Sequence, residues 1–212
     1  MDFRVLLAAP LAALVMTSSA AELRMPQGWH SSYPKESYQA GVDPSMDEPG
    51  RHTLLVQSVG TRDAMQVGGV TQMGYGYAGK RVRFSAQVKA ADTDTWAGLV
   101  LGNKTMDLYM LTAGDDDTMA HLFGAAAGAD WQAVSVVVEV PSDSHDMIYA
   151  GLALVGNGKV WARDLKLDVV GPDVPLSTSK IGFDIARAKA KQQEWQAARA
   201  THKQPPQNLE LQ

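Results

Sequence analysis

The stretch DWQAVSVVVEV, residues 130–140, decides the fold class of this chain. Valine recurs at every second position from Val134 to Val140, so the valines line one face of an extended strand. The opposite face carries Trp131, Ser135, Val137 and Glu139. We therefore predict a strand that is covered fully on one face and partly on the other, as in the centre of an all-β sandwich. Pro141 has no N–H to donate and ends the pairing.

Alternating apolar residues on both sides of this stretch predict further short strands. The clearest is residues 80–90, where Val82, Phe84, Ala86 and Val88 face inward and the intervening Arg and Gln side chains face outward. Other strands are expected over 37–42, 52–59, 66–73, 96–101, 106–111, 147–155 and 159–170, whereas 112–129 shows no regular pattern. Turn residues separate these segments and no helical period does, which predicts an antiparallel β-sandwich or jelly roll over residues 22–170.

Three local signals refine this prediction. The apolar phase of the last strand switches near Arg163 and Asp164, which indicates a β-bulge. The run Gly156-Asn157-Gly158 is typical of a hairpin turn between the last two strands. The pair Gly68-Gly69 indicates a bulge or a close backbone contact.

Residues 1–21 have the pattern of a signal peptide. Arg4 precedes an apolar run over 5–16, and Ser18-Ser19-Ala20 or Ser19-Ala20-Ala21 forms a small-x-small cleavage site. The run is shorter than the roughly 20 apolar residues that span a bilayer. A buried N-terminal helix is the alternative. The signal-peptide interpretation predicts a periplasmic or secreted protein.

The C-terminal part differs in composition from the sandwich. Residues 171–179 contain Pro172 and Pro175 and are expected to form a linker, followed by a helix over 180–203 and a tail over 204–212. Ile181, Ile185, Ala188 and Trp195 form a thin apolar stripe on that helix. The helix is basic, with Lys180, Arg187, Lys189, Lys191, Arg199 and Lys203 against Asp184 and Glu194. It could bind a protein partner in a groove or pack on the sandwich.

Composition and motif spacing argue against several classes of protein. The chain has no cysteine, which excludes disulfides, thiolate metal sites and a cysteine nucleophile. Its formal net charge of −4 gives no basic domain of the kind that binds nucleic acid. The glycine-rich run 74–79 precedes a strand and not a helix, and Ser58 lacks the first glycine of a nucleophile elbow. We therefore expect no enzyme activity and no cofactor. The three aspartates at 115–117 could help to bind calcium, with a solvated acidic loop as the alternative.

A set of outward aromatic and polar side chains provides the candidate ligand-binding residues. Sugar rings stack on Trp and Tyr through their apolar C–H surfaces, and nearby polar groups bind the hydroxyls. The candidates are Arg83, Gln87, Trp96, Tyr149 and Trp161. If they share a concave face they form a glycan groove; the alternative is that the tryptophans cover the ends and edges of the sandwich.

Several short motifs also resemble a known family. They are Gly28-Trp29, Tyr77-Ala78-Gly79-Lys80-Arg81-Val82-Arg83, Trp96-Ala97-Gly98-Leu99, Asp130-Trp131-Gln132, and Gly158-Lys159-Val160-Trp161 leading to Asp164-Leu165. In order and spacing they resemble bacterial exported modules with a galactose-binding-like jelly roll, the architecture of many carbohydrate-binding modules. Related modules are often labelled AraC-type regulators because they occur fused to such regulators, but this chain shows no helix-turn-helix.

The resemblance implies a non-enzymatic, periplasmic or secreted module that binds a glycan or another cell-envelope ligand. A periplasmic protein-interaction factor, acting through the sandwich surface or the basic helix, is the alternative function. A hydrolase is a third, for which no catalytic constellation stands out.

Overall fold

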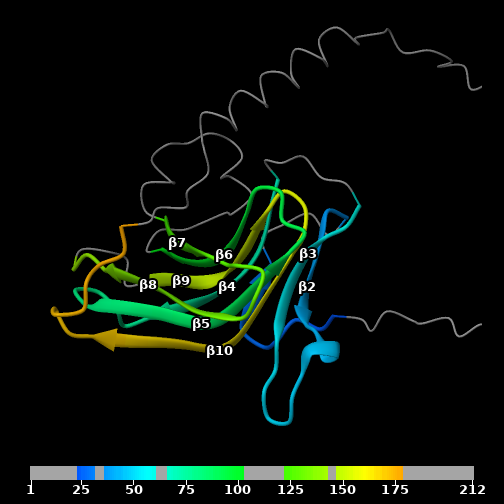
Figure 1. Cartoon of the computed structure of the whole chain (residues 1–212). Coiled ribbons are helices and arrows are strands. Elements are labelled where there is room, and N and C mark those ends of the chain that lie inside the picture. Colours follow the sequence, from blue (N-terminus) through cyan, green and yellow to red (C-terminus); the bar gives the residue numbers. More distant parts are fainter. Residues whose placement is uncertain (1–22, 32–35, 61–65, 103–121, 143–146, 179–212) are drawn as a thin grey trace, which may run out of the picture.

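The structure, a computed structural model, is an antiparallel β-sandwich of two five-stranded sheets (Figure 1). It describes residues 23–31, 36–60, 66–102, 122–142 and 147–178. Sheet A has the order β2 (Tyr38–Val42), β3 (Leu54–Ser58), β10 (Lys159–Val170), β5 (Arg81–Ala91) and β8 (Gln132–Glu139). Sheet B has the order β1 (Trp29–Ser31), β4 (Val67–Tyr75), β9 (Met147–Val155), β6 (Trp96–Gly102) and β7 (Leu122–Ala126). The predicted all-β sandwich is confirmed. The expected signal peptide and the C-terminal helix lie outside the described residues.

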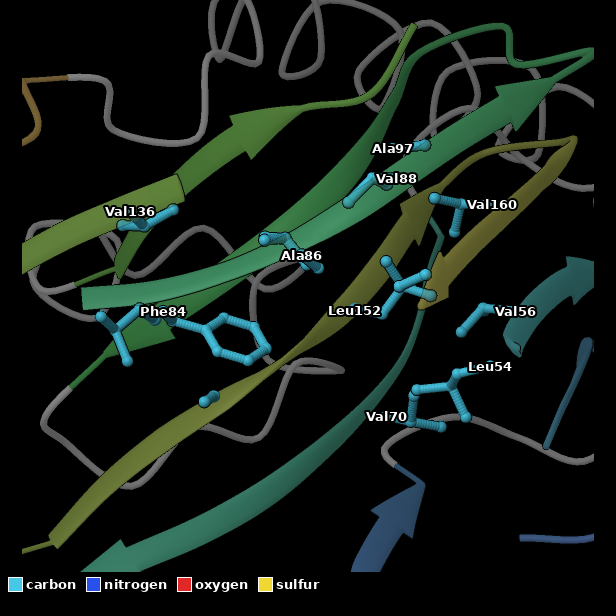
Figure 2. Packing of buried hydrophobic residues seen from close by; sticks show 14 of the residues in the cluster. Leu54, Val56, Val70, Phe84, Ala86, Val88, Ala97, Val136, Leu152 and Val160 are labelled. Atoms are coloured by element: carbon cyan, nitrogen blue, oxygen red, sulfur yellow. The ribbon is translucent and has the colours of Figure 1, made fainter. Parts of the chain in front are cut away.

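The hydrophobic core lies between the two sheets (Figure 2). Strand β5 shows why: every second residue, from Val82 to Ala90, is buried, while the residues between them are partly exposed. Leu152 and Leu154 of β9 and Leu99 of β6 meet this layer from the other sheet and are fully buried. The alternation predicted for residues 80–90 is therefore confirmed.

Strand β8, which contains the diagnostic stretch, lies at the edge of sheet A and not in its centre. It pairs only with β5, in antiparallel register with Arg83 opposite Val137. Val136, Val138 and Val140 are buried against the core as predicted, and Val137 on the other face is buried as well. The prediction of face coverage is correct, and the prediction of a central position is wrong.

The segment 171–178, predicted as a linker, runs along the outer edge of β8. The N–H of Ser177 donates to the carbonyl of Val137 (2.9 Å), and the N–H of Val137 donates to the Ser177 hydroxyl (2.9 Å). Arg81 donates to the carbonyls of Pro172 (2.6 Å) and Val174 (2.8 Å). Part of the open edge of the sheet is thereby paired by a non-strand segment, which limits edge-to-edge association.

Two sequence-based predictions for the loops need correction. Residues 112–129, expected to be irregular, contain β7, which pairs with β6 in register from Gly98–Ala126 to Gly102–Leu122. The strand expected over 106–111 lies outside the described residues. The turn at 156–158 has positive φ at Gly156 and Gly158, as predicted, but it joins β9 of sheet B to β10 of sheet A and is not a hairpin. The Asp94 carboxylate fixes this crossover by accepting from the backbone (2.8 Å) and side-chain (2.7 Å) N–H groups of Asn157.

Tyr38 links the two sheets near this crossover. Its ring is 1% exposed and lies against Gly68 of β4, where an added Cβ would fall 2.3 Å from the Tyr38 Cγ. Its hydroxyl donates to the carbonyl of Gln66 (2.7 Å) and lies 2.9 Å from that of Gly156. Gly68 is therefore the site of the close contact that the sequence indicated.

Strand β9 is buried on both of its faces. Its even-numbered residues point into the core, while Tyr149 and Ala153 point away from sheet A and are nevertheless buried. When the residues on both faces of a strand are buried, its sequence is a continuous apolar run, as in MIYAGLALV. The outer surface of sheet B over β9 is consequently not open to solvent.

Candidate functional site

The outer face of sheet A brings together most of the polar candidates. Residues directly opposite each other in an antiparallel pair point to the same side of a sheet. In this register, Arg83 lies opposite Asp168, Gln87 opposite Arg163, and Lys89 opposite Trp161. Arg83, Gln87 and Trp161 therefore share one face, which the sequence analysis had left as a condition.

A shallow groove of about 690 Å³ crosses this face. Its polar lining comes from Arg83, Ser85 and Gln87 of β5, Ser135 of β8, Lys166 of β10, and the pair Arg51 and Asp164. The small or apolar residues Ala86, Ala133, Val134 and Leu165 complete the lining. The groove thus combines hydroxyl, amide and charged groups with apolar surface.

The predicted β-bulge in β10 shapes one wall of the groove. The pairing of β10 with β5 shifts between Arg163 and Lys166, and Asp164 has φ 56, so the residues of the bulge are turned out of the regular ladder. The Asp164 carboxylate accepts from the Nε (2.9 Å) and Nη2 (2.5 Å) of Arg51. This bidentate contact with Arg51 holds the pKa of the Asp164 carboxyl below its usual range. The bulge therefore places a fixed carboxylate and guanidinium at the groove.

An ordered chain of side chains extends this wall. The Glu48 carboxylate accepts from Arg51 (3.0 Å) and from Arg163 (2.9 Å). The guanidinium carbon of Arg163 lies 4.1 Å from the centroid of the Trp131 ring, within cation–π distance. Arg163 lies opposite Gln87 of the groove, but neither Arg163 nor Trp131 is itself a lining residue.

Trp161 occupies the same face, but its indole N–H is already used. It donates to Asp43 (2.9 Å), which also accepts from the N–H (3.0 Å) and hydroxyl (2.6 Å) of Ser45. Burial raises the pKa of Asp43, but these hydrogen bonds lower it by more, so its net pKa lies below the ordinary value. Trp161 does not line the groove. Its indole N–H thus serves to join β10 to the loop before β3.

We expect the variant Asp43→Asn to be about 2 kcal/mol less stable than the wild type at pH 7, because it loses a charged acceptor of three hydrogen bonds. Since the folded pKa of Asp43 is lowered, its charge stabilises the fold above the unfolded pKa, near 4, and this contribution is lost as the pH falls through the folded value. Urea denaturation at pH 7 and at about pH 2.5 would measure both effects. A gap that stays constant between these pH values would contradict the assignment.

The remaining two candidates lie in the other sheet. Tyr149 is in β9, opposite Met73 of β4, and is 8% exposed. Trp96 is the first residue of β6 and lies opposite Val155. Neither reaches the outer face of sheet A, so a single groove containing Tyr149 together with Arg83, Gln87 and Trp161 does not form.

Sequence reasoning missed most of the polar lining of the groove, namely Arg51, Ser85, Ser135, Asp164 and Lys166, and it missed Glu48, which accepts from Arg51. Arg51 and Asp164 are 113 residues apart and meet only because β3 and β10 are neighbours. The phase switch at Arg163 and Asp164 was the one available signal, since it marked an irregular position in the last strand. No local pattern marks Arg51 or Glu48 as site residues, because they lie in a loop.

The described residues show neither a metal-binding cluster nor a membrane-spanning helix. They contain no group of three or more His, Asp or Glu side chains able to hold a metal ion. Among the same residues, no helix has the length and apolar character needed to cross a bilayer. The aspartates at 115–117, considered for calcium, lie outside this part of the chain.

Comparison with known proteins finds similar structures but no sequence family. No family model matches the chain, and no curated protein matches it. The CBM22-1 xylan-binding domain from Paenibacillus barcinonensis Xyn10C is similar, with 12% identity and a TM-score of 0.47, over 70% of this chain and 90% of that one. The C-terminal family 22 carbohydrate-binding module of Clostridium thermocellum Xyn10B has 14% identity and a TM-score of 0.46, over 70% and 89%.

A structure described as CBM4 has 15% identity and a TM-score of 0.42, over 67% of this chain and 86% of that one. These similarities are weak and concern the arrangement of strands. The ligands of those proteins are therefore not transferred to this chain.

Proposed function

We propose that this protein is a non-enzymatic glycan-binding module and that the groove on the outer face of sheet A is its binding site. The observation that carries the proposal is the composition of the groove, in which Ser85, Gln87 and Ser135 offer hydroxyl and amide groups beside the fixed ions Arg51 and Asp164. A sugar ring presents hydroxyls at its rim and C–H groups on its faces, so it needs both polar partners and an apolar or aromatic surface.

The rigidity of the site supports binding. Most of the polar groups project from paired strands, and Arg51 and Asp164 are locked in an ion pair before any ligand arrives. Preorganised groups lose little conformational entropy on binding, which matters for a shallow site that buries a modest area. Trp131 does not line the groove, but its ring contacts Arg163, the residue opposite Gln87, and in this proposal it supplies the aromatic surface beside the groove.

A glycan array with three variants tests the proposal. We expect Gln87→Ala and Trp131→Ala each to weaken binding to the selected glycans by about tenfold, because each removes a polar or stacking contact worth about 1.4 kcal/mol. Trp96→Ala is the matched control, since it removes a tryptophan from the other sheet and should leave binding unchanged. Thermal melts confirm that each variant is folded.

The proposal fails if the wild type binds no glycan on the array, or if Trp96→Ala abolishes binding while Gln87→Ala does not. Absence of glycan binding would favour the second candidate, a protein-interaction factor acting through residues 180–203. The specific observation behind that candidate is the bonding of Ser177 to Val137 of β8, which holds the residues just before this segment at the edge of sheet A. In either case we propose a periplasmic or secreted setting, on the pattern of residues 1–21.

A further inference from the structure

The outer face of sheet A concentrates positive charge although the whole chain is acidic. The adjacent strands β5 and β10 point their cations to this one face: Arg81, Arg83, Lys89, Lys159, Arg163 and Lys166. Neighbouring strands lie about 4.8 Å apart, and residues two positions apart on one strand are separated by about 7 Å. The cations therefore lie along one face of sheet A, and Arg83 and Lys166 are the two of these six that line the groove.

Acidic side chains on the same face neutralise only part of this array. Arg81 pairs with Glu139 (3.1 Å), Arg83 with Asp168 (3.3 Å), and Arg163 with Glu48 (2.9 Å). Within the described parts of the chain, no carboxylate lies within ion-pair distance of Lys89, Lys159 or Lys166. Lys166 is the one of these three that lines the groove. The groove face thus has a surplus of positive charge.

Arg83, one of the two arginines that line the groove, has N–H groups that its ion pair does not use. Arg83 contacts Asp168 through Nη2 alone, at the long distance of 3.3 Å. Its Nε is buried and has no hydrogen-bond partner among the described residues. A guanidinium carries five N–H donors in a planar fork that fits a carboxylate. Because the Nε is buried, a ligand in the groove would meet the outer Nη groups of Arg83, and Lys166 lines the same groove.

We infer that the ligand of this groove is an acidic glycan, one whose sugars carry carboxylates, as uronic acids do. This inference rests on the proposed function and specifies the class of glycan. The hydroxyl and amide groups of Ser85, Gln87 and Ser135 bind the sugar hydroxyls, while Arg83 and Lys166 bind the carboxylates. The fixed Asp164 carboxylate is neutralised by Arg51 and does not repel such a ligand.

The test uses two polymers with the same sugar backbone, polygalacturonate and its methyl ester, in which each charged carboxylate is replaced by an uncharged ester. We expect the full-length protein to bind polygalacturonate at least tenfold more tightly than the methyl ester at about 20 mM salt. Adding about 0.5 M salt should remove most of this preference, because exposed charges are screened at that ionic strength. Isothermal titration calorimetry measures all four affinities.

Lys166→Gln is the informative variant, and it should reduce the preference for polygalacturonate several-fold with little effect on the methyl ester. Lys80→Gln is the matched control: it removes the same charge from a residue that precedes β5 and donates to the carbonyl of Gly76, away from the groove lining. It should leave the preference unchanged. Both lysines are exposed, so neither substitution threatens the fold.

The outcomes separate this inference from the function on which it rests. Equal affinity for the two polymers, or an equal loss in both lysine variants, overturns the acidic-glycan inference and leaves glycan binding in place. Absence of binding to both polymers and to every neutral glycan on the array overturns the proposed function itself. Polyglutamate is the last control, and binding as tight as that of polygalacturonate would show a general affinity for carboxylate polymers and overturn the inference.

Discussion

Replacing Tyr38 with alanine is expected to lower the free energy of unfolding by about 3–5 kcal/mol, the range for deleting a buried aromatic side chain. The ring is almost fully buried and belongs to the central core cluster. Its hydroxyl bonds join β2 of sheet A to the segments before β4 and after β9 of sheet B. The substitution would leave a cavity and two carbonyls without this partner. Urea denaturation followed by tryptophan fluorescence measures the change.

Tyr38→Phe is the matched control, because it keeps the ring and removes only the hydroxyl. It should cost about 1–2 kcal/mol, the usual penalty for leaving buried hydrogen-bond groups without their partner. If the two variants were equally unstable, packing of the ring would contribute nothing and the argument from burial would fail.

The variant Gly68→Ala is expected to cost about 3 kcal/mol, at the upper end of the range for overpacking. The added Cβ would lie 2.3 Å from Cγ and 2.4 Å from Cδ1 of Tyr38, and the ring cannot move away because its hydroxyl is held. Gly74→Ala, on the same strand, is the control. Its Cβ would first meet Tyr77 Cε2 at 3.1 Å, a contact that a small side-chain movement relieves.

A double-mutant cycle tests the cause of this effect. In the Tyr38→Ala background, Gly68→Ala should be nearly neutral, because the alanine methyl would then enter the cavity left by the ring. Additive costs of the two substitutions would show that Gly68 is required for another reason.

The sequence was a good guide to the strands and to the faces of those strands. Residues such as Val82, Phe84 and Val88 alternate with polar ones because β5 has one face on the core and one toward solvent. Such an alternation of apolar and polar residues can be read directly from the sequence. The bulge in β10 was predictable for the same reason, since one extra residue reverses the phase of burial.

The order of the strands within the sheets was not predictable from these patterns. Alternation records which faces are covered and carries no information about neighbours in the hydrogen-bonding direction. The valine-rich stretch at 130–140 looked like a central strand because Val137 is buried although it points away from the core. In the structure β8 is an edge strand, and the segment 171–178 pairs with its outer edge through Ser177. The turn at 156–158 was wrongly predicted as a hairpin for a similar reason. Its glycines allow a tight turn whether or not the two flanking strands pair with each other, and here β9 and β10 lie in different sheets.

Only part of the candidate site could be predicted. Strand parity predicted that Arg83, Gln87 and Trp161 face outward on their own strands. The pairing of β10 with β5 brings them to one face, and Arg83 and Gln87 line the groove whereas Trp161 does not. Tyr149 has the outward parity on its own strand, but that strand belongs to the opposite sheet, and parity does not say which sheet a strand joins. Arg51 and Glu48 enter the site from a loop, whose path depends on the completed fold.

The bonds between Ser177 and Val137 also have a practical consequence for the smallest piece of this chain that can be expected to fold alone. A fragment ending at Val170, where the last strand ends, would lack both of these hydrogen bonds. It would also lack the carbonyls of Pro172 and Val174, to which Arg81 donates. A recombinant fragment should therefore extend at least to residue 178, so that the exposed margin of β8 keeps its cover and does not become a template for self-association.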